Sequence, residues 1–122
     1  MSETVTLRDD LGIIEIYSFG EPTEEDKLRT QNTVEQICQE KDVSGVLVDA
    51  SKSTSIPTIF ANLDYGANLF RYNAIPRTVR YAIVPSETIK EDCGYYVTVC
   101  QKRGLFIRLF DSVGKAEEWL VS

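Results

Sequence analysis

The stretch Gly45-Val46-Leu47-Val48-Asp49-Ala50-Ser51 decides the fold class of this chain. Its aliphatic run is unbroken, which is typical of a strand buried on both faces, as in a parallel sheet with helices on either side. In such sheets the chemistry lies just beyond the carboxyl ends of the strands. The acid and the hydroxyl-rich segment Ser51-Lys52-Ser53-Thr54-Ser55 that follow the run therefore mark the edge where a functional site is expected.

Strands and helices alternate along the chain around this strand. The patterns predict strands at 3–8, 13–18, 45–50, 78–84 and 105–110, and helices at 23–41, 56–70, 86–104 and from 112 onward. The order is β-β-α-β-α-β-α-β-α, which implies right-handed crossovers. We therefore predict one α/β domain spanning residues 1–122, with a mainly parallel five-stranded sheet, an antiparallel edge strand and four flanking helices.

Local signals predict where the helices begin and which face each one buries. Thr23 followed by Asp26 resembles a capping box, and Ser86 and Ser112 are predicted to begin two later helices. The expected core stripes are Leu28, Val34, Ile37 and Cys38; then Ile89, Cys93, Val97 and Cys100; then Val113, Ala116, Trp119 and Leu120.

Composition excludes several classes of function. The 122 residues carry a net charge of −6, and the pI is about 4.6, which argues against nucleic-acid binding and against docking on anionic membranes. No apolar run approaches 18 residues, and no targeting signal precedes the first strand. The three cysteines form no C-x-x-C pair, so we expect a soluble protein of the reducing cytoplasm.

Histidine is absent from the chain. This excludes Ser-His and Cys-His nucleophile pairs, histidine general bases and the usual histidine-bearing zinc sites. We expect no metal and no cofactor. An enzyme would have to use carboxylates, Lys, Tyr or Cys alone, so we expect a protein that is not an enzyme.

Three pieces of sequence carry a resemblance to a known family. They are the strand Val46-Leu47-Val48-Asp49 with Ser51 behind it, the strand Arg80-Tyr81-Ala82-Ile83-Val84, and the ending Phe110-Asp111-Ser112-Val113-Gly114-Lys115-Ala116-Glu117-Glu118-Trp119-Leu120. With the order of elements, they resemble STAS domains, the fold of the sporulation anti-sigma factor antagonist. The chain is more similar still to the divergent SpoIIAA-like branch, which is grouped with STAS/SEC14-type domains.

The resemblance implies a regulatory module that binds proteins, but one motif departs from the family. Antagonists of this type carry Asp-Ser-Ser-Gly where the loop meets the second helix, and a partner kinase phosphorylates the serine. Here the corresponding stretch reads Lys52-Ser53-Thr54-Ser55-Ile56-Pro57. The family's phosphorylation switch is therefore not reproduced in its usual form.

The residues Asp49, Ser51, Ser53, Thr54 and Ser55 form the first candidate site, a contact or phospho-acceptor loop. The alternative is that these side chains cap the next helix and satisfy loop amides, which is the commoner use of Ser and Thr. A receiver-type phospho-aspartate is excluded at Asp49, because the acidic pair and the lysine that this chemistry needs are missing.

Arg71, Arg77 and Arg80 surround Tyr72 and Tyr81 and form a second candidate site, a patch for an anion or a partner. The alternative is that these arginines are solvated or pair with the surplus acids of the chain.

Two further sets of residues have both a functional and a structural interpretation. Phe60, Leu63 and Phe70 could line a pocket for an apolar ligand such as a lipid, or could pack in the core. Cys93 and Cys100 share a helix face and are expected to be core thiols.

The function expected from these observations is a non-enzymatic STAS-like module that acts through a protein partner. The alternative is a domain that binds a small apolar or anionic molecule, such as a lipid, between the second and third helices. Because the edge strand is exposed, we also expect self-association as a homodimer.

Overall fold

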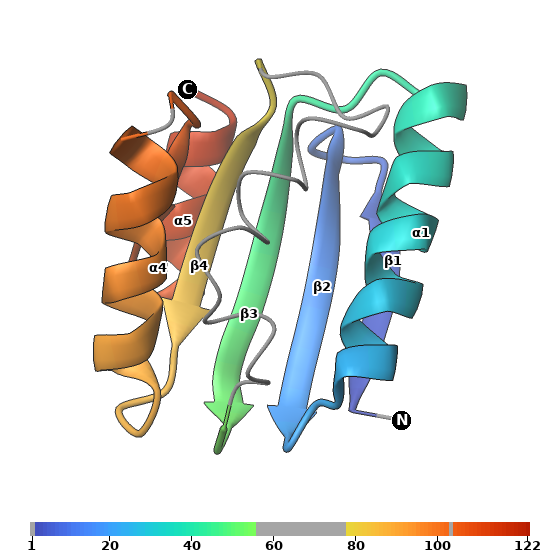
Figure 1. The fold of residues 1–122 in the computed structure, drawn as a ribbon. Coiled ribbons are helices and arrows are strands. Elements are labelled where there is room, and N and C mark those ends of the chain that lie inside the picture. Colours follow the sequence, from blue (N-terminus) through green and yellow to red (C-terminus); the bar gives the residue numbers. More distant parts are fainter. Residues whose placement is uncertain (1, 56–77, 103) are drawn as a thin grey trace.

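The computed structural model describes residues 2–55, 78–102 and 104–122 (Figure 1). The described elements are β1 (Glu3–Arg8), β2 (Ile13–Gly20), α1 (Glu24–Glu40), β3 (Gly45–Ser53), β4 (Arg80–Pro85), α4 (Lys90–Lys102), β5 (Ile107–Leu109) and α5 (Val113–Leu120). They follow the order that the sequence predicts. The helix expected at 56–70 lies outside the described residues.

The five strands form one sheet in the order β1-β2-β3-β4-β5. β1 pairs antiparallel with β2, and every other neighbouring pair is parallel. Helices α1 and α4 lie on one face of the sheet, and α5 lies on the other (Figure 1). The predicted mainly parallel sheet with an antiparallel edge strand is confirmed.

The aliphatic run of β3 is buried on both faces, as its sequence predicts. Val46 belongs to the core between the sheet and helices α1 and α4, where it packs with Cys93 among others. Leu47 belongs to the smaller core under α5, where it packs with Ala116 and Leu120. Both strand residues are fully shielded from solvent.

Gly45 precedes this run because α5 approaches the strand too closely for a side chain. A Cβ at this position would lie 2.7 Å from Leu120 Cδ2 and 3.3 Å from the carbonyl oxygen of Arg80. The glycine therefore lets the last turn of α5 rest on the beginning of β3.

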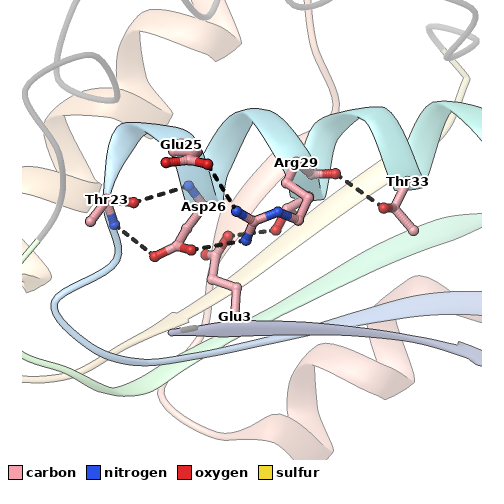
Figure 2. A network of polar contacts seen from close by, with 7 residues as sticks. Glu3, Thr23, Glu25, Asp26, Arg29 and Thr33 are labelled. Atoms are coloured by element: carbon pink, nitrogen blue, oxygen red, sulfur yellow. Dashed lines mark hydrogen bonds and ion pairs between the residues drawn. The ribbon is translucent and has the colours of Figure 1, made fainter.

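The capping box at the start of α1 is confirmed (Figure 2). The backbone N–H of Asp26 donates to Thr23 Oγ1 at 3.1 Å, and the backbone N–H of Thr23 donates to Asp26 Oδ2 at 3.0 Å. The second bond is the main reason why the pKa of Asp26 lies below its ordinary value. Ser112 caps α5 as predicted, since its hydroxyl accepts from the Lys115 N–H at 3.2 Å.

Two local predictions are wrong. Val34 is buried as predicted, but Leu28 is 47% exposed, and α1 buries Lys27 and Thr30 in its place. The inward face of α1 carries Lys27 and Thr30 rather than Leu28 because both donate hydrogen bonds to the Glu3 carboxylate beneath the helix. Ser86 does not cap α4, which begins at Lys90; its hydroxyl donates to the Ser53 carbonyl at 2.6 Å and joins the ends of β3 and β4.

Candidate functional site

The segment expected to be a loop after β3 is partly a continuation of the strand. Lys52 pairs with Phe19 and Ser53 pairs with Gly20, after an irregularity in β2 between Tyr17 and Phe19. Thr54 then fastens the strand end, because its N–H and its hydroxyl both donate to the Gly20 carbonyl, at 2.8 and 3.1 Å. The predicted strand end at Ala50 is therefore wrong by three residues, since β2 is long enough to support β3 as far as Ser53.

Asp49 and Ser51 are joined at the carboxyl end of β3. One carboxylate oxygen, Asp49 Oδ1, accepts from the Ser51 hydroxyl at 2.7 Å and from the Ser51 N–H at 3.2 Å. Because side chains alternate along a strand and Val48 packs on the side of α1 and α4, Asp49 faces the side of α5. Ser51 is exposed and Asp49 is half-buried.

An aromatic pair on β2 lies beside these polar groups. Tyr17 is paired in register with Asp49, and its ring lies 5.4 Å from the ring of Phe19. Tyr17 is 37% exposed. We call Tyr17, Phe19, Asp49 and Ser51 together the Tyr17 surface.

The other hydroxyls of the predicted loop lie differently. Thr54 is exposed and Ser55 is half-buried. Ser53 is 2% exposed, and its buried hydroxyl has no hydrogen-bond partner among the residues that the structure describes. Of the five candidate residues, the structure thus brings Asp49 and Ser51 together at the surface and turns Ser53 inward.

Arg80 is the one member of the predicted arginine patch within the described residues; Arg71 and Arg77 lie outside them. Its Nη1 donates to the carbonyl oxygen of Trp119 at 2.7 Å and to the hydroxyl of Ser122 at 2.9 Å. The guanidinium also lies 5.3 Å from the centre of the Trp119 ring. Arg80 thus holds the end of α5 against β4.

A second arginine, which the sequence pattern does not single out, also lies against this ring. The guanidinium of Arg108 is 5.5 Å from the centre of the Trp119 ring and 5.3 Å from that of Phe110. The sequence did not predict this contact, because an arginine between the inward-facing Ile107 and Leu109 is the usual pattern of an exposed strand position.

A buried polar cluster beneath α1 was also missed. The Glu3 carboxylate, whose residue is 5% exposed, accepts hydrogen bonds from Ser18, Lys27 and Thr30, the last at 2.7 Å. Lys27 also forms an ion pair with it. Strand alternation was the available signal. Glu3 lies two residues before Val5 in β1, so both side chains point to the core face. We call Glu3, Ser18, Lys27 and Thr30 the Glu3 cluster.

The cysteines lie where core thiols are expected. Cys93 and Cys100 are buried, and Cys38 is half-buried. Burial raises the pKa of the Cys93 thiol to about 11, with Lys27 opposing the shift, and it also raises the pKa of Cys38. Cys93 packs on the side of α1 and α4, whereas Asp49 faces the other side of the sheet, so the two cannot act on one substrate atom.

Two other features can be assessed only in the described part of the chain. There, no group of three or more His, Cys, Asp or Glu residues is placed to hold a metal ion, and no helix is long and apolar enough to cross a membrane. Phe60, Leu63 and Phe70, the candidate pocket lining, lie outside the described residues, as does the second helix.

Comparison with solved structures identifies the fold. A protein of the DUF3478 family with a SpoIIAA-like fold, from Shewanella loihica PV-4, is 17% identical, with a TM-score of 0.62, over 97% of this chain and 91% of that one. The anti-sigma factor antagonist SpoIIAA in its unphosphorylated form is 12% identical, with a TM-score of 0.58, over 93% of this chain and 91% of that one. No family model and no curated protein matches the chain. The chain therefore has the SpoIIAA-like fold that the resemblance implies.

Proposed function

We propose that this protein is a non-enzymatic regulatory module of the cytoplasm that acts by binding a protein partner through the Tyr17 surface. The observation that carries the proposal is the placement of an exposed tyrosine beside the Asp49–Ser51 pair at the carboxyl ends of β2 and β3. The SpoIIAA-like fold supports a regulatory role, because one similar structure is an anti-sigma factor antagonist.

The chemistry of the surface suits a switchable protein contact. Tyrosine contributes a large contact area at a small cost in conformational entropy and is enriched at interfaces. Phosphorylation of Ser51 would remove the proton that it donates to Asp49 and add a charge of about −1.5 to −2 beside that carboxylate. The repulsion would separate the two side chains and change the surface offered to a partner.

Quantitative affinity capture from native lysate tests the contact. We expect the variants Tyr17→Ala and Ser51→Ala to lose the same specifically retained proteins, while Ser44→Ala, an exposed serine at the amino end of β3, keeps them. Identical retained proteins for all variants would show that the Tyr17 surface is not the contact.

Mass spectrometry of the protein isolated from its own cells tests the modification. We expect phosphate on Ser51 or Thr54, which are exposed, and none on Ser53, whose hydroxyl is buried. Phosphate on Ser53, or none on any of the three under several growth conditions, contradicts this part of the proposal.

We also propose that two copies associate through β1, which forms one edge of the sheet. The strand contains neither proline nor lysine, two residue types that commonly protect sheet edges. Sedimentation should show a dimer that Thr6→Lys, an exposed position on β1, converts to a monomer. A wild-type monomer at high protein concentration contradicts this interpretation.

A further inference from the structure

A cavity of about 340 Å³ lies at the carboxyl ends of β4 and β5, next to the first residue of α4. Its lining consists of Pro85, Lys90, Arg108, Leu109, Phe110 and Asp111. It shares no residue with the Tyr17 surface. Its volume is near the lower limit for sites that hold small molecules, and its position is the one where open α/β sheets bind ligands.

Among the described residues, the Arg108 guanidinium at this cavity contacts aromatic rings and makes no hydrogen bond. It stacks over Phe110 and Trp119, whose rings are 5.5 Å apart. Arg80, which also lies against Trp119, instead donates to backbone and side-chain oxygens. Stacking orients the Arg108 fork and leaves its N–H groups available, which is the arrangement that binds carboxylate or phosphate in a bidentate manner.

Lys90 is a second cation in the lining of the cavity. In the parts of the chain that the structure describes, no carboxylate forms an ion pair with Lys90 or with Arg108, although the protein has six more acidic than basic residues. The acid in the lining, Asp111, is offset by Lys115 at 3.3 Å. The two cations therefore give this cavity a local positive charge on an acidic molecule.

The remaining lining is apolar, which favours an anion that carries an apolar group over a simple inorganic anion. Leu109 and Phe110, both partly buried, line the cavity beside the two cations, with Leu109 packed on the core of α1 and α4 and Phe110 on the core under α5. The larger cavity at the opposite end of the sheet, of about 380 Å³, is lined by Lys41 and Asp42, whose opposite charges give it no such preference.

From this juxtaposition we propose that the cavity binds a small organic oxyanion, with a phosphate or carboxylate on Arg108 and Lys90 and a compact apolar body against Leu109 and Phe110. This goes beyond the proposed protein contact and does not depend on it. A ligand bound in this cavity would act on the module at a site separate from the Tyr17 surface.

The probe for the test is phenyl phosphate, titrated against isotope-labelled protein and followed by the NMR signals of the backbone and of the arginine Nε–H groups. Inorganic phosphate, benzoate and benzyl alcohol are the comparison probes. We expect saturable shifts at Arg108, Lys90 and Phe110, weaker binding of inorganic phosphate, and no binding of benzyl alcohol. The relative affinity of benzoate identifies the preferred acid group.

Substitutions identify the residues responsible. Arg108→Gln should weaken phenyl phosphate binding by about tenfold or more, since hydrogen bonds to charged groups are the strong ones. Lys90→Gln should weaken it less. Lys102→Gln, at the other end of α4, and Arg29→Gln, on α1, remove the same net charge elsewhere and should leave affinity unchanged.

Three results would overturn the proposal. They are the absence of saturable shifts, equal losses in all four variants, and equal affinity for phenyl phosphate and inorganic phosphate. The second would indicate general charge attraction, and the third would show that the apolar lining contributes nothing. Thermal unfolding of each variant shows whether a loss of binding reflects a loss of folding.

Discussion

The Glu3 cluster and the cavity at Arg108 use charged groups in opposite ways. Beneath α1, one carboxylate accepts from Ser18, Lys27 and Thr30, and the whole arrangement is buried. At the ends of β4 and β5, the two cations Lys90 and Arg108 are exposed and have no acidic partner in the described part of the chain.

Solvent explains the difference. A charge removed from water costs several kcal/mol unless it is paired and hydrogen-bonded, so the Glu3 carboxylate must be fully satisfied by the protein itself. An exposed cation is solvated and loses little by having no partner. Charges in the first region are therefore needed for stability, whereas charges in the second are available for binding.

The largest effect should come from removing the cation of the Glu3 cluster. We expect Lys27→Met to lower the free energy of unfolding by about 3–5 kcal/mol, because it leaves a buried carboxylate without its counter-ion. Chemical denaturation at neutral pH measures the loss. Arg29→Met, whose exposed guanidinium pairs with Glu25 and Asp26 on the same helix, should cost about 1 kcal/mol, because the cation itself lies in solvent.

A double variant separates charge from packing. Adding Glu3→Gln to Lys27→Met should recover part of the lost stability, since the remaining buried group is then neutral. If the double variant is no more stable than Lys27→Met alone, the cluster acts through shape rather than through charge.

Cys93 extends the comparison to a buried acid that stays protonated. Its pKa is raised from 9.0 to about 11, so the folded state holds the thiol proton more tightly than the unfolded state. The resulting stability is present below pH 9 and is lost as the pH rises through about 11. The full loss amounts to about 3 kcal/mol, because the shift is about two pKa units and one unit corresponds to about 1.4 kcal/mol.

The measurement is the difference in unfolding free energy between the wild type and Cys93→Ala at a series of pH values. The difference should be constant up to pH 9 and should narrow from there to pH 11. A parallel pair of curves across this range would mean that the thiol titrates alike in both states.

Loss of a single neutral donor to the Glu3 carboxylate should have a smaller effect. Thr30→Val keeps the shape of the side chain and removes the hydroxyl that donates to Glu3 Oε1 at 2.7 Å. Because Ser18 and Lys27 still donate, we expect a loss of about 1 kcal/mol in urea denaturation. Thr33→Val, whose exposed hydroxyl donates to the Arg29 carbonyl (Figure 2), is the control and should change stability by less.

Features that depend on neighbouring residues could be predicted from the sequence. The run Val46-Leu47 predicted burial on both faces, and Thr23 with Asp26 predicted the start of α1. Both signals are local, since a strand exposes alternate residues to opposite faces and a cap satisfies amides within one turn.

Features that depend on partners distant in the chain could not be predicted from the sequence. The local sequence favours a helix cap at Ser86, but its hydroxyl donates to a carbonyl 33 residues away. Lys27 took the buried position because Glu3, 24 residues earlier, lies beneath α1. In the candidate site, alternation alone did not reveal that Ser53 turns inward, or that Arg108 meets a ring contributed by α5.

The smallest effect on stability is expected at Arg108, and comparison with Arg80 makes it informative. Arg108→Gln should change the free energy of unfolding by no more than about 0.5 kcal/mol, because an exposed guanidinium that only stacks on rings returns to water at little cost. Arg80→Gln removes donors from the Trp119 carbonyl and from Ser122, so it should cost about 1 kcal/mol. Both are measured by denaturation in the same buffer. If Arg108→Gln were the more damaging variant, Arg108 would be a structural residue, and the division between buried charges for stability and exposed charges for binding would not hold at this end of the sheet.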